Sequence, residues 1–194
     1  MMKQVFIIHG WTSTPKSNWK PWLKNKLEKR KFKVFVPNIP DTNYPKIDAW
    51  VKHLTKIVGT PNKNCYFIGH SIGCQTIIRY LQSLPKNSKV GGVVFVAGWV
   101  RLKHEALEDA DDIKLMKPWL ETPIEWKKVV THTKKFVAIF SDNDSFVPIG
   151  DAEIFRKKLG AKITIEHNKG HFSSEDSVFE LPIVLDSILK LSSL

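Results

Sequence analysis

Short runs of consecutive apolar residues alternate along this chain with longer segments in which apolar residues recur at helical spacing. Unbroken apolar runs are typical of strands in a sheet that is covered on both faces. They predict strands at residues 5–8, 33–37, 65–68, 92–96 and 136–140, and residues 162–166 are predicted as a sixth strand. The helical spacing predicts helices at residues 18–30, 47–58, 72–84, 151–159 and 176–191. We therefore predict an α/β fold in which a mainly parallel sheet of about six strands carries helices on both faces.

Residues 100–131 interrupt this alternation. The segment contains an acidic run, Glu105 to Asp112, and Pro118 and Pro123 are expected to break any long helix. So few residues can supply only a short helical flap, and we expect no large cap domain. A chain of 194 residues is long enough for one substantial core and short for two, so residues 1–194 are expected to form a single domain.

The strand predicted at 65–68 and the helix predicted at 72–84 are joined by the sequence Gly-His-Ser-Ile-Gly. This is a G-x-S-x-G element in the strand-to-helix context of a nucleophile elbow. Gly69 and Gly73 lack side chains, which lets the strand and the helix pass close to the turn. The turn lifts the hydroxyl of Ser71 above the sheet and places it at a helix N-terminus, where an oxyanion is stabilised. Ser71 is therefore the candidate nucleophile.

A second loop at the same edge of the sheet begins where the first apolar run stops, at His9 and Gly10. A glycine directly after a buried strand allows the backbone to approach a ligand closely. In a serine hydrolase, this loop supplies one of the two oxyanion donors. We expect the backbone N–H groups of Trp11 and Ile72 to form that oxyanion hole, although a plain strand-ending turn with His9 packed beneath it would look the same in the sequence.

Composition narrows the function without defining it. The net charge is +11, and much of the excess lies in the basic helix at 18–30. Its apolar residues share one face, so the lysines of the segment, Lys20 included, are interpreted as its solvated face. No nucleic-acid-binding motif accompanies the charge, and we expect no specific nucleic-acid partner.

The sequence also bears on membrane association, cellular compartment and cofactors. No apolar stretch approaches the length of a membrane span, so we expect no membrane association. Cys65 and Cys74 fall on a strand and a helix and are interpreted as buried thiols, which favours a reducing cytoplasm. Two cysteines provide no zinc site, and we expect neither a metal nor a cofactor. No pattern indicates the oligomeric state.

A serine nucleophile needs a base and an orienting acid, and both are expected after later strands. Asp142 and Asp144 follow the strand at 136–140. His171 follows the last strand, on a loop and directly after a glycine. The order Ser, Asp, His is the order of the α/β hydrolases.

These motifs carry a resemblance. HGW near the start, GHSIG, SDNDSFVP and GHF resemble the small serine hydrolases of the retinoblastoma-binding-protein-9 and YdeN-like type over nearly the whole chain. The resemblance implies an α/β-hydrolase fold without a cap and a triad of Ser71, Asp144 and His171. It places the acid on Asp144 through the pattern S-x-[DN]-D-x-x-V-P. Ser145 departs from the family, in which proline is frequent at that position.

Two functional hypotheses follow. The first is a carboxylesterase-like serine hydrolase that cleaves a small ester, thioester or amide through an acyl-enzyme. The second is a catalytically weak protein that uses the same fold as a protein-binding module. The complete set of Ser, Asp and His favours the hydrolase, because a binding module has no need to keep them.

Bulky aromatic residues are predicted to shape the substrate pocket. Trp11, His70, Trp99 and Phe146 lie just past strand ends or beside Ser71, and residues 116–126 of the flap are further candidates. Because these side chains fill space in a shallow site, we expect a short acyl group, of about two to six carbons, to be preferred.

Overall fold

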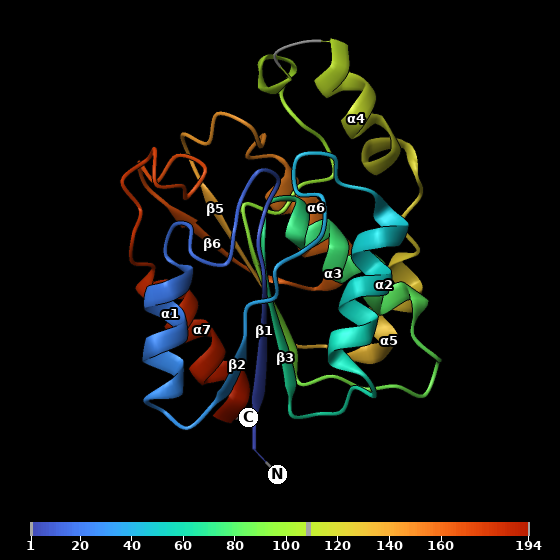
Figure 1. Ribbon diagram of the computed structural model, residues 1–194, viewed down its shortest axis with the longest axis vertical. Helices are drawn as coiled ribbons and strands as arrows, with labels where there is room; N and C mark the ends of the chain where they lie inside the picture. The colour runs from blue at the N-terminus through green and yellow to red at the C-terminus, as the bar shows by residue number, and fades with distance from the viewer. Residues whose placement is uncertain (1, 108–109, 194) are drawn as a thin grey trace.

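The computed structural model describes residues 2–107 and 110–193 and contains one six-stranded sheet with the order β2-β1-β3-β4-β5-β6. All neighbouring strands run parallel. The strands are β1 (Gln4–Ile8), β2 (Lys33–Phe35), β3 (Cys65–His70), β4 (Gly92–Val96), β5 (Phe136–Ser141) and β6 (Lys162–Glu166). The predicted α/β fold with a six-stranded sheet is thereby confirmed (Figure 1).

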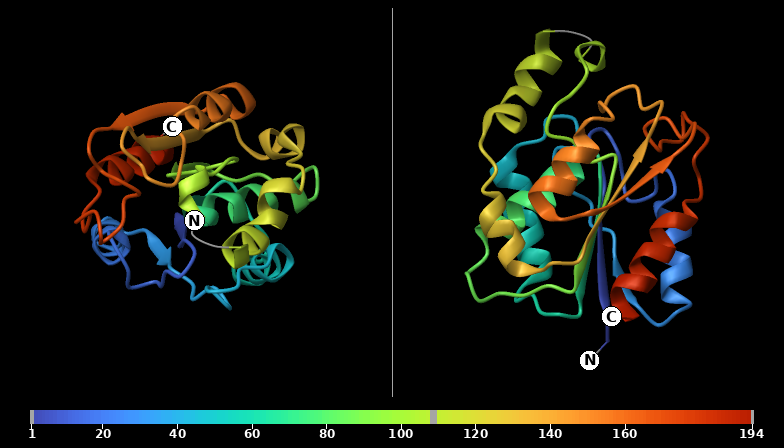
Figure 2. Two further views of the ribbon diagram at one scale, coloured as in Figure 1. Left: turned by 90° about the horizontal axis from the view of Figure 1, so that it is seen from above. Right: turned by 180° about the vertical axis from the view of Figure 1, so that it is seen from behind.

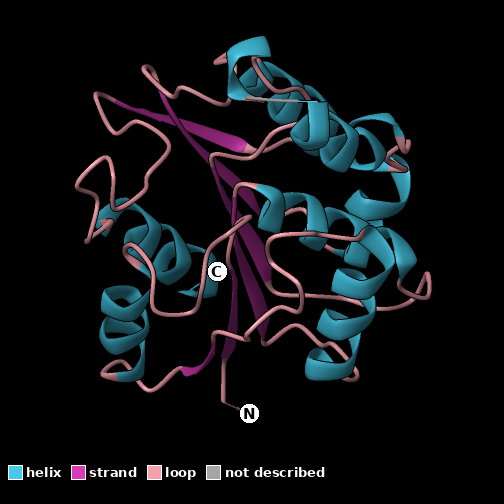
Figure 3. Ribbon diagram, turned by 45° about the horizontal axis from the view of Figure 1, so that its top comes forward, coloured by secondary structure: helices cyan, strands magenta, loops and turns pink. Residues whose placement is uncertain are grey.

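Helices cover both faces of this sheet (Figure 3). One face carries α1 (Lys20–Glu28) and α7 (Pro182–Ser193), and the other carries α2 (Ile47–Val58), α3 (Ile72–Ser83), α5 (Trp126–His132) and α6 (Asp151–Leu159). Every residue of β3, β4 and β5 is buried, as the unbroken apolar runs predicted. Burial on both faces explains why these strands lack the alternation of a half-exposed sheet.

The flap after β4 consists of a short 3₁₀ helix (His104–Ala106) and α4 (Ala110–Glu121), which stands above the carboxyl ends of the strands (Figure 2). Pro118 lies inside α4, so the prediction that it breaks the helix is wrong. Two nearby residues of α4, Met116 and Trp119, pack against the hydrophobic core, and each is about 1% exposed. Their burial outweighs the loss of one backbone hydrogen bond near the end of the helix.

The last helix also differs from its prediction, because it starts at Pro182 rather than at Asp176. The carboxylate of Asp176 instead accepts hydrogen bonds from the backbone N–H groups of His171 and Ser173, at 2.9 and 3.0 Å. These bonds hold residues 171–176 as a loop, and Pro182 then begins the helix at a position where proline is well tolerated.

Strands β1, β3, β4, β5 and β6 all deliver their carboxyl ends to the edge of the sheet that lies uppermost in Figure 1. The sequence-predicted site residues lie at this edge, either on the loops that leave it or, for His70 and Ile72, at the end of β3 and the start of α3. Among the described residues, no helix is long and apolar enough to cross a membrane.

Candidate active site

Ser71 occupies a strained turn between β3 and α3. Its backbone has φ 54° and ψ −125°, a conformation that residues with a Cβ rarely adopt. Its N–H donates to the carbonyl of Val96 at 3.0 Å, and its own carbonyl accepts from Cys74 N–H at 2.8 Å. These two bonds secure the turn against both the neighbouring strand and the helix, so the strain is held in place by the surrounding sheet.

The glycines on either side of Ser71 are required by close packing. A Cβ on Gly69 would lie 2.7 Å from the backbone nitrogen of Cys74, and a Cβ on Gly73 would collide with the carbonyl oxygen of Ile8. Both obstacles are backbone atoms, which cannot swing aside as a side chain can. The physical reason proposed for the two glycines of the G-x-S-x-G element is therefore present in the structure.

His171 and Asp144 form a hydrogen-bonded pair in which the aspartate is buried. Nδ1 of His171 lies 2.9 Å from Oδ2 and 3.0 Å from Oδ1 of Asp144. Oδ1 also accepts the backbone N–H groups of Phe146 and Val147, at 2.8 and 3.0 Å. Only 3% of Asp144 is exposed. Its carboxylate is held by three donors, which are His171 and the two backbone N–H groups. A ring whose Nδ1–H is bound in this way presents Nε2 as a proton acceptor.

The competing carboxylate, Asp142, serves another histidine. Its Oδ2 lies 2.5 Å from Nδ1 of His167, and its Oδ1 accepts the N–H of Asn168 at 3.0 Å. The hydrogen bond from Asn168 and then that from His167 lower the pKa of Asp142. Both partners are exposed, with 80% of the His167 side chain open to solvent. Geometry therefore separates the two aspartates: Asp144 contacts His171, and Asp142 contacts His167.

A cavity of ≈ 250 Å³ brings the predicted residues together. Ser71 and His171 both line it, with Trp11, His70 and Phe146. The remaining wall is rich in hydroxyl and other polar groups: Thr12, Ser13, Ser17, Asn18, Ser173, Ser174 and Glu175. The aromatic ring of Phe146 lies 4.7 Å from that of His171, centroid to centroid. Ser71 and His171 therefore share one small cavity whose wall is largely polar.

Trp99 does not line this cavity, contrary to its prediction as a pocket residue. It is 1% exposed, and its backbone carbonyl accepts a hydrogen bond of 2.8 Å from Nε2 of Gln75. A residue just past a strand can turn back into the core as easily as outward. Here Trp99 belongs to the hydrophobic core.

The two backbone groups predicted to form an oxyanion hole flank Ser71. Ile72 is the first residue of α3. A Cβ on Gly10 would lie 3.3 Å from the Cβ of Ser71, so the loop that contains Trp11 passes directly beside the serine. The side chain of Trp11 is held by a 3.1 Å hydrogen bond from Nε1 to the carbonyl of Asn43.

Lys20 is the residue that the sequence interpretation placed wrongly. It was assigned to the solvated face of the basic helix, but it is 0% exposed, because it opens α1 beneath the loop of residues 10–18. Its Nζ donates to Oγ of Ser13 at 3.2 Å. Burial lowers the pKa of Lys20 to about 7. Its position at the first turn, next to Trp19, gave no signal that distinguishes it from the exposed lysines that follow.

His9 lies beneath the same loop and has a structural role. Its Nδ1 donates to the carbonyl of Gly10 at 3.1 Å, and its Nε2 accepts the N–H of Ile39 at 3.2 Å. Burial is the main cause of its lowered pKa. Both ring nitrogens are used within the fold, so His9 holds the loop in place. Within residues 2–107 and 110–193, no group of three or more His, Cys, Asp or Glu residues is arranged to hold a metal.

Comparisons with known proteins identify relatives of this chain. The hydrolase YdeN of Bacillus subtilis (strain 168) is 27% identical over 186 residues, which cover 96% of this chain and 94% of that protein. Its crystal structure matches with a TM-score of 0.89, at 26% identity and 100% coverage of both chains. The serine hydrolase RBBP9 of Rattus norvegicus is 23% identical over 172 residues, which cover 88% of this chain and 86% of that protein. The family model described as "Serine hydrolase" matches residues 5–190, and the chain therefore belongs to this serine hydrolase family.

Proposed function

We propose that this serine hydrolase cleaves carboxylic esters, thioesters or amides through an acyl-enzyme, with Ser71, His171 and Asp144 as its catalytic triad. The observation that carries the proposal is the contact of 2.9 Å between Nδ1 of His171 and the buried carboxylate of Asp144. His171 also lines the same cavity as Ser71. The strained turn of Ser71 is a second, independent support.

The chemistry follows from this geometry. Asp144 accepts the Nδ1–H of His171 and thereby selects the tautomer whose Nε2 is free to take the proton of the Ser71 hydroxyl. Ser71 Oγ then attacks the carbonyl carbon, and the imidazolium is stabilised by the carboxylate. His171 returns the proton to the leaving group as the acyl-enzyme forms. Water attacks the acyl-enzyme in the second half of the cycle, with His171 again as the base.

The negative oxygen that develops during each attack needs hydrogen-bond donors. The N–H groups of Trp11 and Ile72 are the proposed donors, because both lie beside Ser71 and the second sits at the positive end of a helix. The loss of one such donor costs about 10²–10³ in rate in a serine hydrolase.

The alternative of a protein-binding module has less support. The relative RBBP9 is named a serine hydrolase, and the family model that matches the chain is described as "Serine hydrolase". The strain at Ser71 is also costly, on the order of 1–3 kcal/mol for such a residue, and a protein without a nucleophile has no use for it. A pure binding role would explain neither this strain nor the contact of His171 with the buried carboxylate of Asp144.

A fluorophosphonate probe tests the proposal directly. The parent protein and a Ser88→Ala control, which alters a loop remote from the cavity, are expected to be labelled. Ser71→Ala is expected to lose labelling and to lose turnover of p-nitrophenyl acetate by about 10⁴ or more. Labelling that persists in Ser71→Ala would overturn the assignment of the nucleophile.

A further inference from the structure

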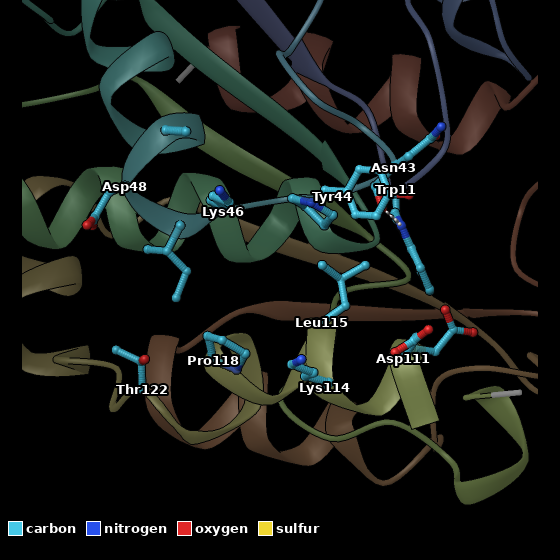
Figure 4. Close-up of a pocket in the computed structure, with 14 residues that line it drawn as sticks. Trp11, Asn43, Tyr44, Lys46, Asp48, Asp111, Lys114, Leu115, Pro118 and Thr122 are labelled. Atoms are coloured by element: carbon cyan, nitrogen blue, oxygen red, sulfur yellow. Dashed lines mark hydrogen bonds between the residues drawn. The ribbon is translucent and has the colours of Figure 1, made fainter. Parts of the chain in front are cut away.

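A second and larger cavity, of ≈ 1090 Å³, lies between the flap helix α4 and the start of α2 (Figure 4). We call it the flap groove. Its apolar lining comes from Pro45 and Ile47 on one wall, from Leu115 and Pro118 on the other, and from Trp11 and Tyr44 at one end. Figure 4 shows Leu115 and Pro118 on the α4 side and Trp11, Asn43 and Tyr44 grouped together. Lys46, Asp48 and Lys114 are exposed and also line it, as do Asp111 and Asp112, so the lining combines apolar side chains with charged groups.

The two walls of the flap groove are fastened to each other. Nε1 of Trp119, on α4, donates to the carbonyl of Pro45 at 2.9 Å. Nη2 of the buried Arg79 donates to the carbonyls of Trp119 and Thr122, at 2.9 and 3.0 Å. The ring of Trp119 packs edge-on against Trp50 of α2, with 5.9 Å between centroids. These contacts hold α4 at a fixed distance from α2, so the flap groove is preformed in the fold.

Trp11 connects the flap groove to the candidate active site, because it lines both cavities. Its indole is fixed by the hydrogen bond from Nε1 to the carbonyl of Asn43, another residue of the flap groove. Trp11 is also a proposed oxyanion donor through its backbone. A substrate bound at Ser71 therefore has one end beside the flap groove.

The chemistry of acyl transfer decides which end of the substrate lies beside the flap groove. His171 must protonate the leaving group, so the leaving group lies on the side of His171, among the hydroxyl-rich wall of the smaller cavity. The flap groove contains neither His171 nor Ser71, and of the described residues only Trp11 lines both cavities. The chain attached to the acyl carbon is the part that can extend past Trp11 into it.

On the basis of the proposed function, we propose that the flap groove binds the acyl chain, and that the preferred substrates are esters or thioesters of medium-chain acids, of about eight to twelve carbons. A short acyl group was expected from the sequence because Trp11, Trp99 and the flap were thought to fill the site. Trp99 is instead in the core, and α4 forms a wall of the flap groove without filling it.

A chain-length series of p-nitrophenyl esters tests the proposal, at concentrations below micelle formation. kcat/KM is expected to rise from acetate to decanoate by about tenfold or more, since each buried methylene contributes up to about fourfold. Leu115→Trp, which fills the flap groove, is expected to lower the ratio of decanoate to acetate kcat/KM by about tenfold. Lys117→Trp makes the same change on α4 at an exposed residue that does not line the flap groove, and it is expected to leave the ratio unchanged.

Binding without turnover separates this inference from the proposed function. Decanoic acid is expected to bind Ser71→Ala more tightly than acetate does, by calorimetry, and Leu115→Trp added to that variant is expected to remove the difference. Two results would overturn the flap groove assignment and leave the triad standing. One is Ser71-dependent acetate hydrolysis with equal kcat/KM for decanoate and acetate. The other is a preference for decanoate that survives Leu115→Trp. Chain-length-dependent binding with no Ser71-dependent hydrolysis would overturn the triad and keep the flap groove as an acyl site.

Discussion

His70 supports the backbone of His171. Its Nε2 donates a hydrogen bond of 2.8 Å to the carbonyl oxygen of His171, although 101 positions separate the two residues. Because a carbonyl only accepts, the proton of the His70 ring sits on Nε2. The pKa of His70 lies well below its ordinary value, chiefly through burial and then through the charges of His171 and Lys20. A neutral ring keeps this bond throughout the neutral pH range.

We therefore predict that His70→Ala lowers kcat by about 10- to 100-fold, because the loop that carries His171 loses its support. KM is expected to change little, and circular dichroism would verify that the variant is folded. His70→Gln, whose amide can donate to the same carbonyl, is expected to recover part of the loss. Parental kcat in His70→Ala would show that residues 141–147 alone position His171.

The two aspartates after β5 give a second prediction. Asp144→Asn is expected to lower kcat by about 10⁴, because the amide no longer holds His171 in the required tautomer. Asp142→Asn removes only an exposed contact with His167 and is expected to stay within a few-fold of the parent. Steady-state kinetics of both variants on one ester would compare them, and the reverse ranking would move the acid to Asp142.

The close packing at the elbow gives a third prediction, on stability. A Cβ on Gly73 would collide with the carbonyl of Ile8 in the central part of the sheet, so Gly73→Ala is expected to lower the free energy of unfolding by about 2 kcal/mol or more. Gly150→Ala is the control, because its Cβ would meet only the flexible end of Arg101, at 3.3 Å. Urea denaturation of both variants measures the difference. Similar midpoints for the two would mean that α3 can shift away from β1 at little cost.

The sequence was sufficient where a feature depends on neighbouring residues alone. Unbroken apolar runs predicted the strands β1 to β5 to within a few residues, and among the described helices α2 and α6 start and end at the predicted positions. The elbow was also predictable, since a serine between two glycines at a strand-to-helix junction has few other uses. The order Ser, Asp, His followed from the rule that parallel strands deliver their loops to one edge and from the order typical of α/β hydrolases, whereas the choice of Asp144 over Asp142 rested on the family resemblance.

The sequence was insufficient where distant segments decide the outcome. Trp99 and Lys20 are both buried, and their burial depends on the packing of segments that no local pattern identifies. Pro118 remains inside α4 because contacts of Met116 and Trp119 outweigh its local preference. The flap groove depends on the bond from Trp119 to Pro45, which spans 74 positions, and no local pattern encodes such a contact.

Lys20 yields the last prediction, because a buried ammonium group makes stability depend on pH. The unfolded chain keeps the Lys20 proton up to its ordinary pKa of 10.5, whereas burial lowers the pKa in the folded protein to about 7. Between these values the unfolded state binds more protons, so this residue makes the free energy of unfolding increase as pH rises from about 7 to 10.5. His9 and His70, the titratable groups that act on it, both have lowered pKa values and stay neutral across this window.

Lys20→Met keeps the apolar stem and removes the charge, so it is expected to raise the free energy of unfolding at pH 7 by about 1–4 kcal/mol. The gain is expected to shrink towards pH 10, where the parent folds with Lys20 already neutral. Lys24→Met, one turn later on α1, removes an exposed lysine that lies 3.8 Å from Glu28 and is expected to show no such pH-dependent gain. Urea denaturation at pH 6, 7, 8.5 and 10 would measure all three proteins. A gain from Lys20→Met that does not vary with pH would mean that the ammonium group reaches water in the folded protein, and that its burial beneath the loop of residues 10–18 is only transient.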